Sequence, residues 1–452
     1  MVKKLSKILL FVLSFTLYTS HLTAQNQDST LSREIEVKIP ADKAENLLKL
    51  YTSLSRLKIG GYGEAVYSRN FYSDNFNRYS QPEIYKNNGS HGRTDLPHVT
   101  LFLGYEFGKG WRMNTEIEFE HGGSEAAVEL EAEESGEYES EIERGGEVAL
   151  EQFWIEKTFN STFNLRMGHI IVPIGYTNGN HLPNQFFTVY RPEGENTILP
   201  CTWHETGISL WGFLSKKWKY EIQVVPGLDS EMFNRRNWIQ GGSASPYEFK
   251  VANKLAGVVR LDNYSIKGLR LGLSGYCGQS FKNSMQPSQS SKFKDIKGTV
   301  YIGAFDFDYK GHNIISRGYF DYGHLMNSEV ISTYNKSLSK YSPSARSNVA
   351  SDALCAGFEI GYDFFSQIQK MHNEKQKCYV FGRYEYYDSM FKTAENIVSA
   401  GWTQRQKIVG GINYFPIKEI VVKAEYAAGL LKHPFNNENS FSIGIAYAGF
   451  FN

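Results

Sequence analysis

Beyond its N-terminus the sequence lacks any long hydrophobic run, and this absence limits how the chain could cross a membrane. A membrane-spanning helix needs about 18 consecutive apolar residues, and no later stretch approaches this length. Mean hydropathy is −0.40, although 15% of the 452 residues are aromatic. We therefore exclude helical transporters and receptors.

The sequence also lacks an excess of charge of either sign. Lysine and arginine together number 48, as do aspartate and glutamate, so the formal net charge is zero. A nucleic-acid-binding protein usually carries a basic excess, and a disordered acidic chain carries the opposite. We expect no nucleic-acid partner.

Cysteines are few and catalytic motifs are missing. Cys201, Cys277, Cys355 and Cys378 show no C-x-x-C spacing, which favours free thiols, buried or facing lipid, over a disulfide or a zinc site. The chain has no G-x-S-x-G and no phosphate loop, and His204 lacks the second histidine of H-E-x-x-H. We expect no enzymatic activity, no cofactor and no metal.

The N-terminus has the three parts of a secretory signal. Three lysines precede the eleven-residue run 8–18, and small residues follow up to Ala24. We predict a signal peptide at 1–24, followed by a periplasmic segment at 25–56 that contains one short amphipathic helix. An uncleaved anchor is the weaker interpretation, because the run is too short to span a bilayer.

From Leu57 onward the hydrophobic pattern repeats every second residue, which is typical of β-strands. Trp218, Tyr220 and Ile222, for example, alternate with charged or amide side chains, so one face of that strand is apolar and the other polar. We predict sixteen strands in the region 57–452, beginning near Leu57, Pro97, Gly110, Glu147, Thr162, Trp203, Lys217, Val251, Gly268, Gly298, Asn313, Ser351, Gln376, Thr403, Glu419 and Ser440.

Short turns alternate with long loops of about ten to thirty residues along this region, except at 364–376, where a short turn is due. An even number of strands, a secretory signal and Phe451 near the end of the chain indicate an all-β fold, a sixteen-stranded antiparallel transmembrane β-barrel with a short N-terminal helix. A closed barrel is the only sheet that pairs every backbone group within lipid. We expect it in the outer membrane of a Gram-negative bacterium, in contact with lipid and lipopolysaccharide.

One of the long loops is strongly acidic. Between residues 125 and 143 it has nine glutamates and no basic residue. Binding of a divalent cation that ties the loop to lipopolysaccharide, or repulsion of anions, stays open. We prefer a simply solvated loop, because calcium sites need convergent geometry.

The connection between Gly175 and Pro200 differs from an ordinary surface loop, because aromatic and proline residues are frequent in 181–187 and around Arg191. Surface loop tips are usually small and polar, so this segment is expected to pack against another surface. In a barrel the available surface is the inner wall. We predict a constriction loop in the lumen; the alternative is an outward loop folded on its own core.

These segments also carry a family resemblance. Residues 166–175, 181–187, Arg191-Pro192 and 203–207 are similar to the phosphate-selective porin O and P family, and 383–388 resembles the late-strand arginine motif of that family. The resemblance spans most of the mature chain. It implies sixteen-stranded homotrimeric porins that pass small anions, with a ladder of lumenal arginines in the phosphate-specific members.

Strand alternation assigns charged residues to the lumenal face. The candidate pore-lining and constriction residues are Arg112, Arg166, Arg191, Lys219, Arg270, Arg317, Arg383, Glu385, Lys423 and Glu425. The same alternation assigns Lys407 and at least as many acidic residues to that face. Each arginine could therefore form a salt bridge in the wall instead of belonging to an anion ladder.

Together these observations favour a porin, a passive water-filled channel for small hydrophilic solutes or anions, with weak selectivity and no tight phosphate site. Two other functions stay open. One is an adhesin-like surface protein with a closed lumen. The other is a barrel hydrolase that assembles serine and histidine from separate strands.

Overall fold

The computed structural model describes residues 55–121, 126–132, 138–144, 148–245, 249–284, 293, 295–342 and 344–451, with the backbone alone for 126–132 and 138–144. The chain divides into one unit over Met1–Leu54 and a second over Ser55–Asn452. The predicted signal peptide and the short helix expected ahead of the barrel lie outside the described residues.

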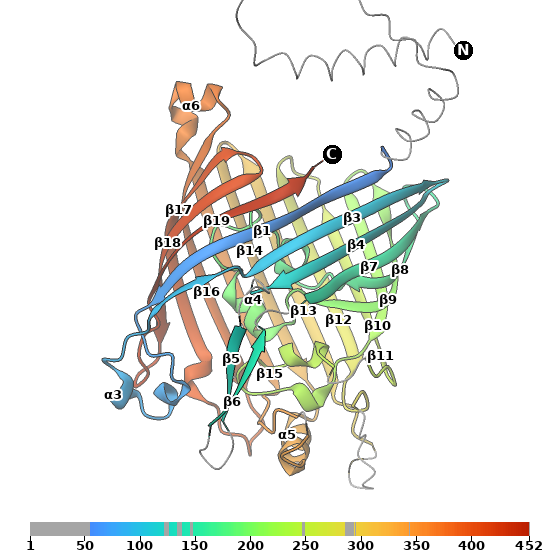
Figure 1. The fold of residues 1–452 in the computed structure, drawn as a ribbon. Helices are drawn as coiled ribbons and strands as arrows, with labels where there is room; N and C mark the ends of the chain where they lie inside the picture. The colour runs from blue at the N-terminus through green and yellow to red at the C-terminus, as the bar shows by residue number, and fades with distance from the viewer. Residues whose placement is uncertain are drawn as a thin grey trace, which may run out of the picture. The chain divides into compact units, whose positions relative to one another are not determined.

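The second unit is a closed antiparallel β-barrel, which confirms the predicted fold class. Sixteen long strands pair in chain order, and β1 pairs with β19 to close the sheet (Figure 1). These strands are β1 (Leu57–Asn70), β3 (His98–Gly108), β4 (Trp111–Glu120), β7 (Val148–Thr158), β8 (Asn164–Ile171), β9 (His204–Ser215), β10 (Trp218–Pro226), β11 (Leu255–Asn263), β12 (Leu269–Gln279), β13 (Thr299–Gly311), β14 (Ile314–Leu325), β15 (Asp352–Asp363), β16 (Lys377–Lys392), β17 (Gln404–Ile417), β18 (Ile420–Leu431) and β19 (Ser440–Phe450).

The remaining elements are short. A four-residue strand, β2 (Gly92–Asp95), pairs with β1, and β5 (Ala126–Ala132) pairs with β6 (Tyr138–Arg144) within the acidic loop. The side chains of that loop lie outside the described residues, so its predicted alternatives stay open. The helices and 3-10 turns are η1 (Phe76–Tyr79), α3 (Pro82–Tyr85), η2 (Thr177–Gly179), α4 (Glu193–Ile198), η3 (Ser230–Met232), η4 (Gln240–Ser243), α5 (Ser328–Ser337), η6 (Phe364–Gln367), α6 (Gln369–Asn373) and η7 (Gly401–Thr403).

Every predicted strand start lies within four residues of an observed one. The largest difference is at β11, predicted near Val251 and observed from Leu255, because residues 251–254 belong to the preceding loop. The long connection 364–376, where the sequence pattern predicts a short turn, forms η6 and α6 at the end of the barrel that otherwise has short turns (Figure 1). The helices α3 and α5 lie at the opposite end. Within the described residues, no helix has the length and apolar character to cross a membrane.

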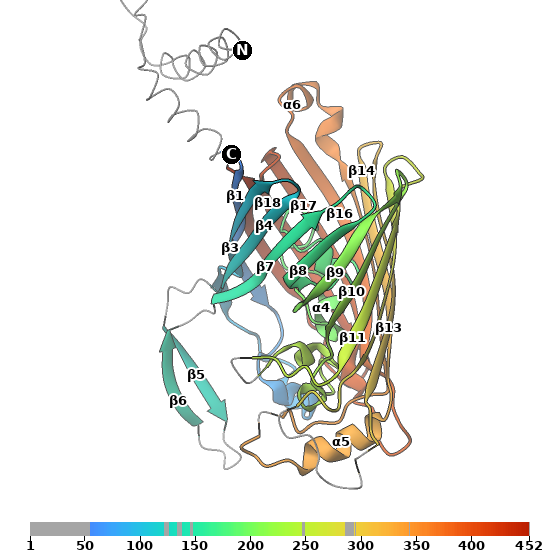
Figure 2. The ribbon, with the colours of Figure 1, turned by 90° about the vertical axis from the view of Figure 1, so that its right-hand side faces the viewer.

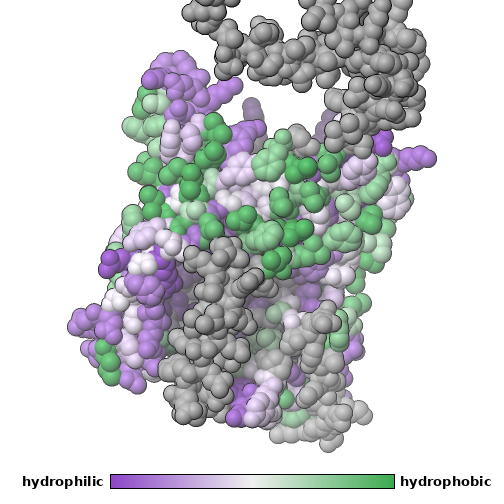
Figure 3. All heavy atoms as spheres, viewed as in Figure 1, coloured by the Kyte–Doolittle hydropathy of each residue, from purple (hydrophilic) through white to green (hydrophobic). Residues whose placement is uncertain are grey.

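The outer face of the barrel is apolar because side chains alternate along each strand. On β10, Ile222 is 46% exposed and Val224 49%, whereas their neighbour Gln223 is 1% exposed. Hydrophobic residues gather on the outer wall over β1, β3 and β4 in Figure 3. This surface is the one that a transmembrane barrel presents to lipid.

Long connections fold inward and form a hydrophobic core. Trp203 of the β8–β9 connection, Trp238 of the β10–β11 connection and Ile331 of α5 are fully buried in one cluster with side chains from β10 to β16. The ring of Trp238 lies where a Cβ on Gly323 would stand, so β14 has a glycine on its inner face at this point. Packed apolar side chains therefore fill part of the lumen.

Candidate functional site in the barrel lumen

The β8–β9 connection, residues 172–203, runs inside the barrel and is hereafter the inward loop. Its backbone is bound by side chains of widely separated strands. The N–H of Gly175 donates to Ser274 Oγ on β12 at 3.2 Å, and Asn413 Nδ2 on β17 donates to the carbonyl of Phe187 at 3.0 Å. Figure 2 shows α4, which belongs to this loop, between the walls of the barrel. The structure thus places the loop in the lumen, as its aromatic composition predicts.

Two predicted pore-lining residues on β18 hold the centre of the inward loop. Lys423 Nζ donates to the carbonyls of Phe186 and Thr188 at 3.1 and 2.7 Å. Glu425 Oε2 accepts from the N–H of Val189 at 2.8 Å. The two charged side chains are buried, with 2% and 6% exposed. Their hydrogen bonds to the loop backbone replace those that water would otherwise supply.

A third such residue, Glu385 on β16, receives the start of α4. Its two carboxylate oxygens accept from the N–H groups of Glu193 and Gly194 at 3.3 and 3.5 Å. Lys407 Nζ lies 2.7 Å from Glu193 Oε2. Burial by itself would raise the pKa of Glu193, but Lys407 and Arg405 outweigh it and lower this pKa to about 2. Glu193 is therefore ionised at neutral pH and ties α4 to β17.

Arg317 on β14 and Arg383 on β16 both bind the carboxylate of Glu359. Arg317 Nη1 lies 2.6 Å from Glu359 Oε1, and Arg383 Nη1 lies 2.7 Å from Glu359 Oε2. Arg383 Nη2 also lies 2.7 Å from Glu385 Oε1. The two guanidinium groups are almost fully buried, so these pairs form a closed network in the wall.

Glu156 on β7 likewise serves two predicted arginines. Arg112 Nε donates to Glu156 Oε1 at 2.8 Å, and Arg166 Nε donates to Glu156 Oε2 at 2.9 Å. The indole N–H of Trp211 donates to the same Oε2 at 2.9 Å. Lys219 contacts the same tryptophan, with its Nζ over the Trp211 ring at 5.4 Å from the ring centre. Two guanidinium groups share this one carboxylate, so these contacts leave the wall cluster with a net positive charge.

The remaining predicted arginines also have acidic partners. Arg270 Nη1 lies 2.5 Å from Asp306 Oδ1 and 3.0 Å from Asp262 Oδ1. Arg191, on the inward loop, donates to Tyr62 Oη at 3.2 Å and lies 3.6 Å from Glu118 Oε1. A modest preference for anions would follow if Arg166, Arg191 and Arg383 converged at the constriction, but each binds a different carboxylate.

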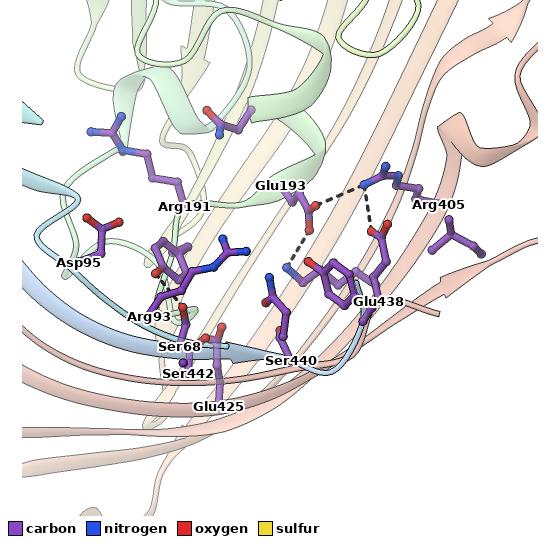
Figure 4. A pocket seen from close by; sticks show the side chains of 18 of the residues that line it. Ser68, Arg93, Asp95, Arg191, Glu193, Arg405, Glu425, Glu438, Ser440 and Ser442 are labelled. Atoms are coloured by element: carbon purple, nitrogen blue, oxygen red, sulfur yellow. Dashed lines mark hydrogen bonds and ion pairs between the residues drawn. The ribbon is translucent and has the colours of Figure 1, made fainter. Parts of the chain in front are cut away.

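A polar cavity of about 610 Å³ lies beside the inward loop. Figure 4 shows the polar and charged side chains that line it from β1, β2, β17–β19 and the inward loop. Excluding histidine, four of the lining residues are basic and four acidic: Arg93, Arg191, Arg405, Lys407, Asp95, Glu193, Glu425 and Glu438. Arg405 lies 3.1 Å from Glu438, so opposite charges pair within the cavity.

Sequence reasoning missed several charged residues of the lumen. Arg405 shares its strand face with Lys407, so alternation alone could have identified it. Arg260 donates to both Asp262 and Asp306. Alternation does not identify it as lumenal, because its strand has valines at both 258 and 259 and so no clear polar face. Arg93 comes from the four-residue strand β2, which is too short for a periodic signal.

Comparison with known proteins identifies the fold of this chain but does not assign it to a family. No family model matches the chain. An uncharacterized protein of Aquifex aeolicus is 26% identical over 410 residues, which cover 86% of this chain and 79% of that protein.

Among solved structures, OmpF of Salmonella typhi in complex with daunomycin has a TM-score of 0.50 at 10% identity, covering 87% of this chain and 97% of the other. The outer membrane channel DcaP of Acinetobacter baumannii has a TM-score of 0.47 at 12% identity, with coverage of 87% and 97%. Sixteen paired strands and the likeness to OmpF together show that this chain has the barrel fold of outer-membrane porins.

Proposed function

We propose that the chain is an outer-membrane porin, a passive channel for small hydrophilic solutes that the inward loop narrows. The observation that carries this proposal is a closed barrel with an apolar outer face and a polar cavity of about 610 Å³ beside that loop. The signal peptide predicted at 1–24 and Phe451 near the end of the chain support the proposed location. The family resemblance extends the proposal to a homotrimer, which native mass spectrometry in detergent would detect as three chains per particle.

The proposed channel selects only weakly between anions and cations. Basic and acidic residues around the cavity are equal in number, and close opposite charges largely cancel at a distance. Physiological salt screens the remainder beyond about 8 Å. A tight phosphate site would need arginines with free N–H pairs, whereas Arg317 and Arg383 already bind Glu359.

Single-channel recording in planar bilayers tests the proposal. We expect discrete conductance steps, a small reversal potential in a salt gradient, and no block of chloride current by micromolar phosphate. The double variant Arg405→Glu, Lys407→Glu should shift the reversal potential toward cations. Lys418→Glu, whose side chain is 89% exposed in a short turn, is the control and should leave the reversal potential unchanged.

Strong block of the chloride current by micromolar phosphate would instead support phosphate selectivity, the function of the phosphate-selective porin O and P family that the sequence resembles. It would make Arg166, Arg191 and Arg383 the first residues to mutate.

A second candidate function is a surface-binding protein with a closed lumen. The specific observation in its favour is the hydrophobic core, in which Trp203, Trp238 and Ile331 fill lumenal space that a wide channel would leave to water. The same recordings separate the two functions. A folded barrel that shows no conductance steps would support the closed lumen and exclude the porin.

A further inference from the structure

A buried group of three side chains lies between the inward loop and the barrel wall, apart from the networks described above. Glu116 comes from β4, Glu151 from β7 and His181 from the inward loop, and one potential ligand atom of each lies within 4.8 Å of the others. Their exposed fractions are 1%, 2% and 7%.

A bulge in the wall creates this arrangement. Glu116 pairs with Gln152 and the next residue, Ile117, pairs with Leu150, so Glu151 is an extra residue in β7. Glu151 and Gln152 are both turned away from the outer face, although neighbours in a regular strand face opposite sides. Bulges often re-aim a side chain in this way beside functional sites.

The atoms that face one another in this group have no hydrogen-bond partners. Glu116 Oε1, Glu151 Oε2 and His181 Nε2 are all buried and unpartnered within the described structure. The opposite ring nitrogen, Nδ1, lies 3.0 Å from the carbonyl oxygen of Asn178, which can only accept, so Nδ1 carries a proton. In neutral imidazole Nε2 is then a bare lone pair, 3.6 Å from Glu116 Oε1.

A nitrogen lone pair and two carboxylate oxygens that face one another repel unless a proton or a metal cation lies among them. The nearest arginine, Arg191, is engaged with Glu118 and Tyr62. A buried charge without compensation is costly, whereas one divalent cation would neutralise both carboxylates. An imidazole whose Nδ1–H is held by a backbone carbonyl presents Nε2 in the orientation typical of a metal ligand.

We propose that Glu116, Glu151 and His181 bind one divalent transition-metal cation, of the zinc class, which ties the inward loop to β4 and β7. One imidazole nitrogen with two carboxylates suits zinc better than magnesium or calcium, which prefer oxygen ligands alone. Ligand atoms around tetrahedral zinc stand about 3.4 Å apart, so the three side chains would close by about 1 Å on binding. Arg191 borders both this site and the cavity.

Zinc binding by the full mature chain in detergent, after removal of metal with a chelator, tests the proposal. We expect one zinc per chain by competition with a zinc-binding dye, and a higher unfolding temperature with zinc than without it. Glu151→Gln and His181→Asn should each weaken zinc binding at least about tenfold. Glu221→Gln is the matched control, because Glu221 is also a buried lumenal glutamate but binds Ser209, and its zinc affinity should match that of the unmodified chain.

X-ray absorption of the zinc-loaded, unmodified chain gives a readout that does not depend on the variants folding. It should show one imidazole nitrogen among oxygen ligands. An unmodified chain that binds no zinc, or binds calcium and magnesium as tightly as zinc, would overturn the proposal. So would His181→Asn that keeps full zinc affinity. A channel without conductance but with zinc bound would refute only the porin proposal.

Discussion

At the scale of single residues, the two faces of a strand impose different demands on their side chains. Outward positions need only be apolar, because they meet lipid, whereas inward positions meet a packed interior of loops and ion pairs. Gln223 on β10 illustrates the second case: its Nε2 donates to the carbonyl of Ile171 at 2.9 Å and to Glu221 Oε1 at 2.8 Å. A polar inward residue is thus not necessarily a residue in open water.

The first prediction concerns the outward face. Replacing Ile222 by arginine places a charge in lipid at the middle of β10, so we expect the free energy of unfolding to fall by about 2–4 kcal/mol. Denaturant titration of the refolded barrel in lipid vesicles measures it, with Ile222→Leu as the control. If arginine is tolerated as well as leucine there, Ile222 does not face lipid.

The second prediction concerns a glycine on the inner face of β15. A Cβ on Gly361 would come 2.4 Å from the ring of Phe187, which is buried and stacked on Phe381 with ring centres 5.2 Å apart. Gly361→Ala should therefore displace the inward loop and cost about 1–3 kcal/mol of unfolding free energy. Gly382→Ala on β16, where a Cβ meets nothing within 4 Å, should change the stability far less under the same denaturant titration.

The third prediction concerns pH and Glu193. Its pKa is about 2 in the folded barrel, below the usual value of 4.5, so its ionised form stabilises the fold at neutral pH. The stability advantage of the unmodified chain over Glu193→Gln should shrink as the pH falls below about 4.5 and disappear below about 2. Unfolding temperatures of both proteins across this range measure it, and an advantage that grows in acid would contradict the assignment.

At the scale of elements, the inward loop is bound by strands from several parts of the barrel wall. Ser274 of β12, Glu385 of β16 and Lys423 of β18 all bind its backbone. Composition reveals such a loop, because aromatic residues avoid exposed tips. Its individual partners could not be predicted, because strand alternation assigns a face to Glu385 or Lys423 but does not say what lies opposite.

The fourth prediction tests this element directly. Deletion of residues 184–195 removes the first three residues of α4 and the backbone atoms that Glu385, Glu425 and Lys423 bind, so conductance per channel should increase if the loop narrows the pore. Stability should fall as well, because buried charges lose their partners. Deletion of 369–373, which removes α6 at the other end of the barrel, is the control. Unchanged conductance in a folded deletion variant would mean that the loop is not the constriction.

At the scale of the whole molecule, closure of the sheet explains why the barrel is expected to resist unfolding by detergent. β1 pairs with β19 from Gly60 with Phe450 to Asn70 with Ser440, so the barrel has no long free edge. Opening such a sheet in an apolar medium leaves many backbone groups unpaired, which makes closed barrels resistant to detergent.

The fifth prediction follows from closure. The mature chain should migrate differently on detergent gels before and after boiling, and it should fractionate with the outer membrane. A chain that lacks residues 440–451 cannot close against β1 and should lose the difference. Recovery of the intact protein from a soluble periplasmic fraction would refute the proposed location.

The sequence by itself determined the number of barrel strands, their starts to within four residues, and the face of each residue wherever the alternation is regular, because a period of two residues is a local property of the backbone. It also identified the loop that enters the lumen from its composition. Only the tertiary structure decided which charges meet. Glu359 joins Arg317 to Arg383, and Glu116, Glu151 and His181 come together from three elements. The reason is that such contacts depend on strand register, on the bulge at Glu151 and on the path of the inward loop across the barrel, none of which leaves a periodic signal along the chain.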